Sequence, residues 1–135
     1  MVSDIFVNLP VKDLARAQTF FRALGFMFDP RFTDDQAACL VLGAHIYAML
    51  LAEPFFQTFT PKAISDAHRS TEVLTALAVE SRAAVDTLVS RAVAAGGRIP
   101  RDPQDDGFMY GHAFEDLDGH IWEVLYMAPE AVTPE

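Results

Sequence analysis

The sequence predicts an α+β protein made of two tandem βαβββ modules, and three observations lead to this prediction. The stretch HIYAMLL at 45–51 aligns without a gap with HIWEVLY at 120–126. Each stretch closes a half of the chain in which an apolar strand, a helix and three short strands follow in the same order. The 135 residues are 51% hydrophobic, which suits one compact domain with a real core. Within a single domain spanning 1–135, we expect module one at about 3–52, a linker at 53–70 and module two at about 71–128.

The first half opens with an apolar, β-branched strand at 5–11. Asp13 is a good helix N-cap, and Gly25 is a typical residue to end the helix. Between them, four apolar residues recur at helical spacing: Leu14, Ala17, Phe21 and Leu24. Three strand-like runs follow near 26–31, 36–42 and 44–52, with turns at Asp34-Asp35 and at Gly43.

The second half repeats this order, beginning with a strand at 73–79. Ser81 caps the helix, and Gly96-Gly97 ends it. Its apolar stripe consists of Val85, Leu88, Val89 and Ala92. Strand-like runs follow near 98–102, 108–116 and 119–127, and Asp118-Gly119 supplies the last turn.

The linker is unusually aromatic, because Phe55, Phe56 and Phe59 lie between Pro54 and Pro61. Aromatic side chains on a loop usually mean that the loop packs onto the protein. Two interpretations stay open: the segment covers the junction between the modules, or it forms a lid or wall of a ligand pocket.

Composition and charge exclude several classes of protein. The sequence has no run of about 18 apolar residues and no basic segment followed by an apolar one, so we expect neither a membrane-spanning nor a secreted protein. The single cysteine, Cys39, excludes an intramolecular disulfide and a cysteine-based metal cluster, which fits a cytoplasmic location. The net charge of −9 argues against nucleic acid as a partner.

Two segments carry a resemblance to a known superfamily: FVNLPVKDLARAQTFFRALGF near the start and MYGHAFEDLDGHIWEVLYM near the end. The chain resembles the vicinal-oxygen-chelate superfamily, which includes glyoxalase I, bleomycin- and fosfomycin-resistance proteins and extradiol dioxygenases. It is most similar to small bacterial proteins called glyoxalase-like or lactoylglutathione-lyase-related. The resemblance implies paired βαβββ modules whose curved mixed sheets surround a cavity. It also implies a homodimer and, in the enzymes, a divalent metal in the cavity.

The resemblance places the metal ligands of the superfamily on the first and last strands of each module. In this sequence those positions are Phe6, Leu74, Ala48 and Glu123, of which Glu123 alone can bind a metal. Because catalytic zinc and iron centres normally have three or more protein ligands, we expect no cofactor at this site. A divalent metal at a displaced site stays open.

Glu123 is therefore the candidate catalytic residue. Strand alternation puts it on one face with Ile121 and Leu125, and Trp122 and Val124 on the other. Arg101 could meet an anionic substrate or an acidic neighbour. The candidate substrate-binding residues are Asn8, Phe6, Leu74, Tyr110, His112 and Phe56. Each of these residues has a structural alternative, namely ordinary packing or a backbone hydrogen bond for the polar ones.

Three functions follow from this site. The first is a lyase or isomerase in which Glu123 removes a proton next to a carbonyl group. The second is a non-catalytic protein of the bleomycin-resistance kind that sequesters a small molecule. The third and weakest is an extradiol-type dioxygenase, which requires two histidines and a carboxylate on iron. Whether the protein is an enzyme stays open.

Overall fold

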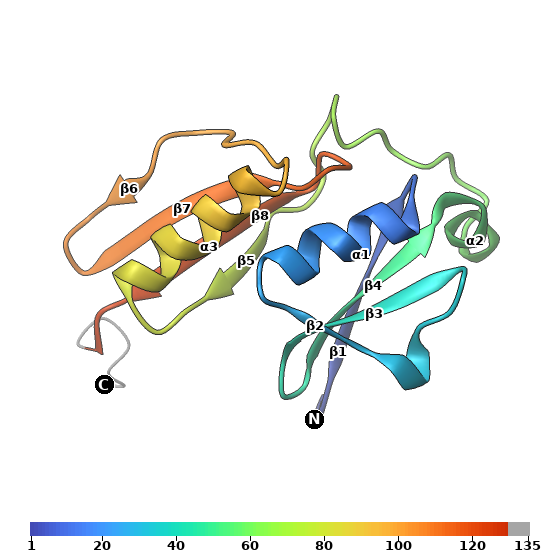
Figure 1. Cartoon of the computed structure of the whole chain (residues 1–135), viewed down its shortest axis with the longest axis horizontal. Coiled ribbons are helices and arrows are strands. Elements are labelled where there is room, and N and C mark those ends of the chain that lie inside the picture. Colours follow the sequence, from blue (N-terminus) through green and yellow to red (C-terminus); the bar gives the residue numbers. More distant parts are fainter. Residues whose placement is uncertain (130–135) are drawn as a thin grey trace. The chain divides into compact units, whose positions relative to one another are not determined.

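A computed structural model of the chain describes residues 1–129, and it confirms the α+β class and the two-module architecture. The chain divides into two compact units, Met1–Asp66 and a second that begins at Ala67. Each unit holds a four-stranded mixed sheet, with strand order β1-β4-β3-β2 in the first and β5-β8-β7-β6 in the second (Figure 1). The two orders are equivalent, as expected for a duplicated βαβββ module.

The first unit follows the predicted order closely. Asp13 caps its main helix, because the carboxylate accepts a hydrogen bond from the backbone N–H of Arg16 at 3.0 Å. The elements of this unit are β1 Ile5–Val11, α1 Leu14–Ala23, β2 Met27–Asp29, a 3₁₀ turn at Pro30–Phe32, β3 Ala37–Gly43 and β4 Ile46–Ala52.

The second unit repeats the pattern, with Ser81 capping its helix through a 3.0 Å hydrogen bond from the N–H of Ala84. Its elements are β5 Thr75–Ala78, α3 Arg82–Ala94, β6 Gln104–Asp105, β7 Met109–Glu115 and β8 Ile121–Met127. A strand predicted at 98–102 is replaced by a single bridge between Arg98 and Glu115 and by the short β6. Pro100 and Pro103 explain the difference, because a proline has no N–H to donate to a strand ladder.

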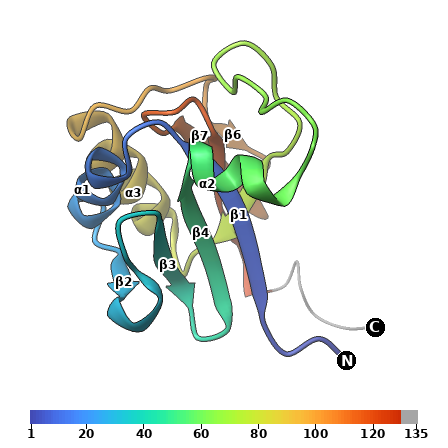
Figure 2. The same ribbon diagram turned by 90° about the vertical axis from the view of Figure 1, so that its right-hand side faces the viewer.

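The aromatic segment after β4 forms a short helix, α2 Glu53–Phe56, and a 3₁₀ turn at Gln57–Phe59. The rings of Phe55 and Phe59 pack edge to face at 5.1 Å. The side chain of Gln57 donates to the carbonyls of Thr60 and Lys62, which holds the turn. Helix α2 contacts β1 and β4 (Figure 2), so this segment packs onto its own unit.

Each unit has its own core between its helix and one face of its sheet. In the first unit, α1 buries Ala17, Phe20 and Phe21 on the side where Leu40, Ala48 and Leu50 are fully covered. In the second, the residues buried between α3 and the sheet are Val85, Val89, Ala92, Phe114, Trp122 and Val124. No helix within residues 1–129 has the length and apolar character needed to span a bilayer.

The turn between β7 and β8 is held by Asp116, whose side chain is buried. Its carboxylate accepts hydrogen bonds from the N–H groups of Asp118 and His120 and from Trp122 Nε1, at 2.9, 3.0 and 3.0 Å. Burial raises the pKa of Asp116, and these hydrogen bonds act in the opposite direction. Gly119 completes the turn with φ near +88°, a conformation that favours glycine. This turn sets where β8 begins, and so where Glu123 lies.

Candidate functional site

Glu123 lies in the middle of β8, on the face of the second sheet turned away from α3, which we call the open face. Trp122 and Val124 on either side are fully buried in the core, so Glu123 must point the other way. The predicted alternation along this strand is confirmed. The Glu123 side chain is 28% exposed.

On the strands either side of β8, the open face around Glu123 carries small side chains. Ala76 on β5 and Ala113 on β7 are its partners in the adjacent strands. Two residues further along β8 and on the same face, Leu125 is flanked by Ala78 and Gly111. Because these cross-strand neighbours have at most a methyl group, the larger side chains next to the carboxylate are Ile121 and Leu125 on its own strand and the Arg101 that reaches it.

Arg101 is the polar partner of Glu123. Its Nη2 donates to Glu123 Oε2 at 3.1 Å, and its Nη1 donates to the carbonyl of Asp102 at 3.2 Å. The bridge of Arg98 to Glu115 and the pairing of Gln104 with Gly111 place Arg101 beside β7, so its side chain crosses β7 to reach β8. An acidic neighbour is one of the two partners that the sequence predicts for Arg101, and this neighbour is Glu123.

The counterpart of Glu123 in the first unit is Met49, not Ala48 as the gapless alignment suggested. Asn8, three residues before Val11, pairs with Met49, whereas Ala76, three residues before Val79, pairs with Glu123. Ala48 is fully buried on the side of its sheet that faces α1. A shift of one residue in strand pairing moves every side chain to the other face, which is why Ala48 and Glu123 lie on opposite faces of their sheets. The β3–β4 ladder also shifts register between Val41 and Gly43, whereas β7 and β8 pair without interruption.

Phe6 and Asn8 occupy the corresponding open face of the first sheet, and both are exposed. The ring of Phe6 stacks on that of Tyr47 with centroids 4.8 Å apart. Leu74 lies just before β5 and is 53% exposed. Phe56 ends α2 and is half-buried.

Tyr110 and His112 lie on the opposite face of the second sheet from Glu123, because they pair with Tyr126 and Val124 on β8. The Tyr110 hydroxyl donates to Asp86 Oδ1 on α3 at 2.5 Å, and this bond raises the pKa of Tyr110. Burial lowers the pKa of His112. The structure therefore does not bring these two predicted residues together with Glu123.

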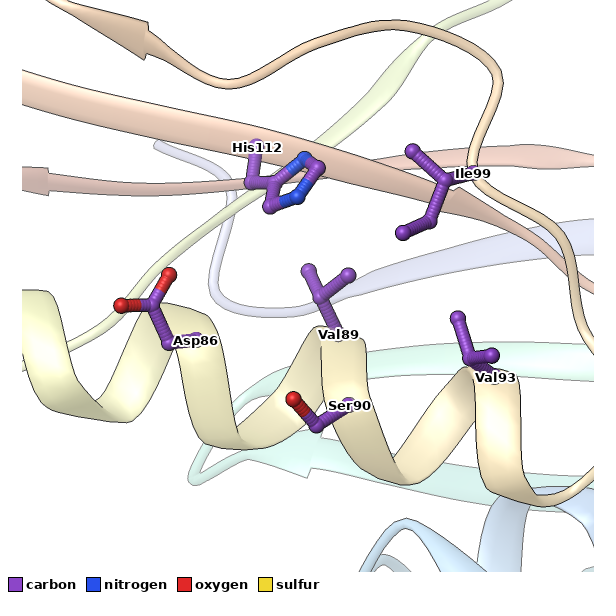
Figure 3. Close-up of a pocket in the computed structure, with 6 residues that line it drawn as sticks. All are labelled: Asp86, Val89, Ser90, Val93, Ile99 and His112. Atoms are coloured by element: carbon purple, nitrogen blue, oxygen red, sulfur yellow. The ribbon is translucent and has the colours of Figure 1, made fainter.

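Sequence reasoning missed the pocket beside these two residues, which has a volume of about 340 Å³ (Figure 3). Four of its residues come from one face of α3, at positions 86, 89, 90 and 93. This helical spacing was the available signal, but the apolar stripe of α3 was assigned to the core alone.

The residues present do not fit the divalent metal that the superfamily resemblance implies. Phe6 and Leu74 carry no donor atoms, and the Met49 counterpart offers only a thioether. Glu123 is held by Arg101, a cation. Within the part of the chain that the structure describes, no group of three His, Cys, Asp or Glu side chains is arranged to hold a metal ion.

Comparison with known proteins supports the fold and the resemblance. A family model described as bleomycin resistance protein-like N-terminal matches residues 5–43. Among solved structures, a hypothetical protein from S. aureus is 29% identical, with a TM-score of 0.78 over 93% of this chain and 95% of that one. No curated protein matches the sequence significantly.

Two further structures share the fold at lower identity. A glyoxalase/bleomycin resistance protein/dioxygenase family enzyme from Burkholderia phytofirmans is 19% identical, with a TM-score of 0.75 over 90% of this chain and 96% of that one. The fosfomycin resistance protein FosX from Mesorhizobium loti is 14% identical, with a TM-score of 0.69 over 97% of this chain and 98% of that one.

Proposed function

We propose that this chain is a member of the vicinal-oxygen-chelate superfamily and that it binds a small organic molecule over the open face of its second sheet. The observation that carries the proposal is the Arg101–Glu123 pair standing above alanine and glycine neighbours. Small-ligand sites typically combine apolar surface with a few polar groups that fix the orientation of the ligand. The pair offers a donor and an acceptor at one point of such a surface.

Stability alone accounts poorly for this pair. An ion pair with side chains 39% and 28% exposed contributes about 0–1 kcal/mol to folding. A guanidinium has five N–H donors, and the two contacts of Arg101 leave others to meet a ligand oxygen. The names of similar proteins, which refer to glyoxalase and to bleomycin or fosfomycin resistance, support a small-molecule ligand.

Thermal-shift titration tests the binding role, using cationic glycopeptides such as bleomycin and a panel of small aromatic molecules. We expect the ligand-induced rise in melting temperature to fall in both Glu123→Gln and Arg101→Gln. Glu115→Gln is the matched control, because Glu115 belongs to the same face one strand away and is not part of the pair. A ligand that stabilises all of these variants equally would contradict the proposed site.

A second candidate function is catalysis with Glu123 as the general base. The carboxylate would take a proton from a carbon next to a carbonyl group, and the negative charge would move to the carbonyl oxygen. The specific observation that favours this reaction is Arg101, which places a positive charge 3.1 Å from Glu123, where it can stabilise the oxyanion. Arg101 must then leave Glu123 Oε2 when the substrate enters.

Turnover of the methylglyoxal–glutathione hemithioacetal separates the two candidates. If the protein is a lyase of this kind, Glu123→Gln should lower kcat about 100-fold or more, whereas Glu115→Gln should leave it unchanged. Activity that survives in Glu123→Gln removes Glu123 as the base. Ligand binding without turnover in the unmodified protein supports sequestration. An extradiol-type dioxygenase is not proposed, because the donor set does not fit an iron centre.

We further propose that the protein works as a cytoplasmic homodimer. β1 and β5 are edge strands of their own sheets, and apolar residues on or beside them are exposed: Ile5, Phe6, Val73 and Leu74. Exposed apolar edges usually require a partner. Sedimentation equilibrium should give about twice the 14.9 kDa of one chain. A mass of one chain at micromolar concentration would contradict the dimer.

A further inference from the structure

The pocket between α3 and β7 has the features of a ligand site separate from Glu123. Its volume of about 340 Å³ lies at the lower end of the range for small-molecule pockets. The lining residues are Asp86, Val89, Ser90, Val93, Ile99 and His112. All six belong to the second unit, and the sheet separates them from the open face.

The pocket has a polar end and an apolar end (Figure 3). Asp86 and His112 lie at one end, Val93 and Ile99 at the other, and Val89 lies between them. Val93 and Ile99 are about half exposed, at 43% and 50%. A molecule with one polar group and a compact hydrocarbon body matches this arrangement.

His112 is the buried polar group of the pocket. Its residue is only 9% exposed, and Nδ1 has no hydrogen-bond partner among residues 1–129. Buried polar atoms in native proteins nearly always have a partner. The ring projects from β7 towards α3 (Figure 3), so a molecule in the pocket can hydrogen-bond to the imidazole. Burial lowers the pKa of His112 and favours its neutral form, which leaves one ring nitrogen as an acceptor.

Asp86 gives the pocket its charge. Apart from the neutral His112, it is the only ionisable residue of the six, and its Oδ1 accepts a hydrogen bond from the Tyr110 hydroxyl. The two cations near the pocket are already paired with carboxylates. Arg82, whose guanidinium lies 5.0 Å from the centroid of the Tyr110 ring, pairs with Asp105 at 2.7 Å, and Arg101, whose charge acts on His112, pairs with Glu123 at 3.1 Å. The pocket is therefore negative, which favours a cation and disfavours an anion.

We propose that the pocket between α3 and β7 binds a small organic ammonium ion. The ammonium group lies at the end formed by Asp86 and His112, and the hydrocarbon body lies against Val89, Val93 and Ile99. Neither Glu123 nor Arg101 lines this pocket, so the proposal is tested separately from the function proposed above.

Three molecules of the same shape and different charge test the proposal: benzylamine, benzyl alcohol and benzoate. Each is titrated into the full-length protein, and the ring C–H signals of His112 are followed by NMR and identified by their loss in His112→Gln. We expect saturable shifts with benzylamine in the millimolar range, weaker binding of benzyl alcohol and none of benzoate. Binding of benzoate as tight as that of benzylamine, or no shift with benzylamine, would overturn the proposal.

Two variants locate the binding site. Asp86→Asn keeps an acceptor for Tyr110 but removes the charge, and it should weaken benzylamine about tenfold without weakening benzyl alcohol. Ser90→Phe, at an exposed position of α3, should fill the pocket and abolish binding of both. Glu72→Gln makes the same change of net charge elsewhere and should leave binding unchanged. Equal weakening in Glu72→Gln, or full binding in Ser90→Phe with a native melting curve, would refute this site.

Discussion

At the scale of single residues, Ala48 and Met49 show how far one step along a strand changes the surroundings of a side chain. Ala48 is fully buried towards α1, whereas Met49 is half-buried on the other face of the same sheet. Ala48→Glu would bury an unpaired carboxylate and should lower the free energy of unfolding by about 3 kcal/mol or more. Met49→Glu should cost about 1 kcal/mol.

Urea unfolding of these two variants measures the difference directly. Each adds the same charge to neighbouring positions of one strand, so each is the control of the other. If Ala48→Glu were the better tolerated of the two, the register that makes Met49 the counterpart of Glu123 would be wrong.

Asp116 is the second residue whose replacement should have a large effect. Asp116→Ala removes the acceptor of three hydrogen bonds, including that of the buried Trp122 Nε1. We expect a loss of about 3 kcal/mol in the free energy of unfolding, measured by urea denaturation. Asp35→Ala is the control, because Asp35 is an exposed turn carboxylate. A similar small effect in both variants would show that the turn does not depend on Asp116.

At the scale of elements, the contact between Arg82 at the start of α3 and Asp105 on β6 makes the free energy of unfolding depend on pH in the acid range. The hydrogen bonds of Arg82 and of the Gly107 N–H lower the pKa of Asp105 from 3.8 to about 2. Because the folded pKa lies below the ordinary value, this stabilisation is present above pH 3.8 and is lost as the pH falls towards 2.

Replacing the carboxylate should therefore flatten this dependence. In Asp105→Asn, the urea midpoint should fall less steeply between pH 4 and pH 2 than in the unmodified protein, because one proton-linked group is gone. Asp106→Asn, one residue along and exposed, is the control. Parallel pH profiles for Asp105→Asn and the unmodified protein would contradict the assignment.

Most elements could be predicted from local chemistry, because caps and periodicity act within a few residues. Asp13 and Ser81 marked the helix starts, and the alternation around Glu123 followed from strand geometry. The register of β4 on β1 could not be predicted, because it is set by the pairing of strands that lie far apart in the sequence. An acidic partner was only one of the two alternatives predicted for Arg101. Glu123 could not be named as that partner, because the two residues are far apart in the sequence.

At the scale of the whole molecule, the chain has the fold of glyoxalase/bleomycin-resistance proteins, and within residues 1–129 it lacks the donor set of a divalent metal site. We therefore expect neither EDTA nor added Mn²⁺ or Zn²⁺ to change the melting temperature of protein purified without a chelating resin. A metal ion raises the melting temperature only of a folded protein that binds it. A stoichiometric divalent ion found by elemental analysis, or a lower melting temperature after EDTA, would contradict this expectation. Either result would indicate a metal site away from the superfamily's usual position.

The one-residue difference between the registers of β4 and β8 also limits how the two halves of the gene can change together. A recombination event that copied 120–126 over 45–51 would preserve reading frame, length and most of the hydrophobic pattern. It would nevertheless put a glutamate at position 48, inside the first core. Such a copy should therefore destabilise the first unit although it leaves the sequence of the second unchanged.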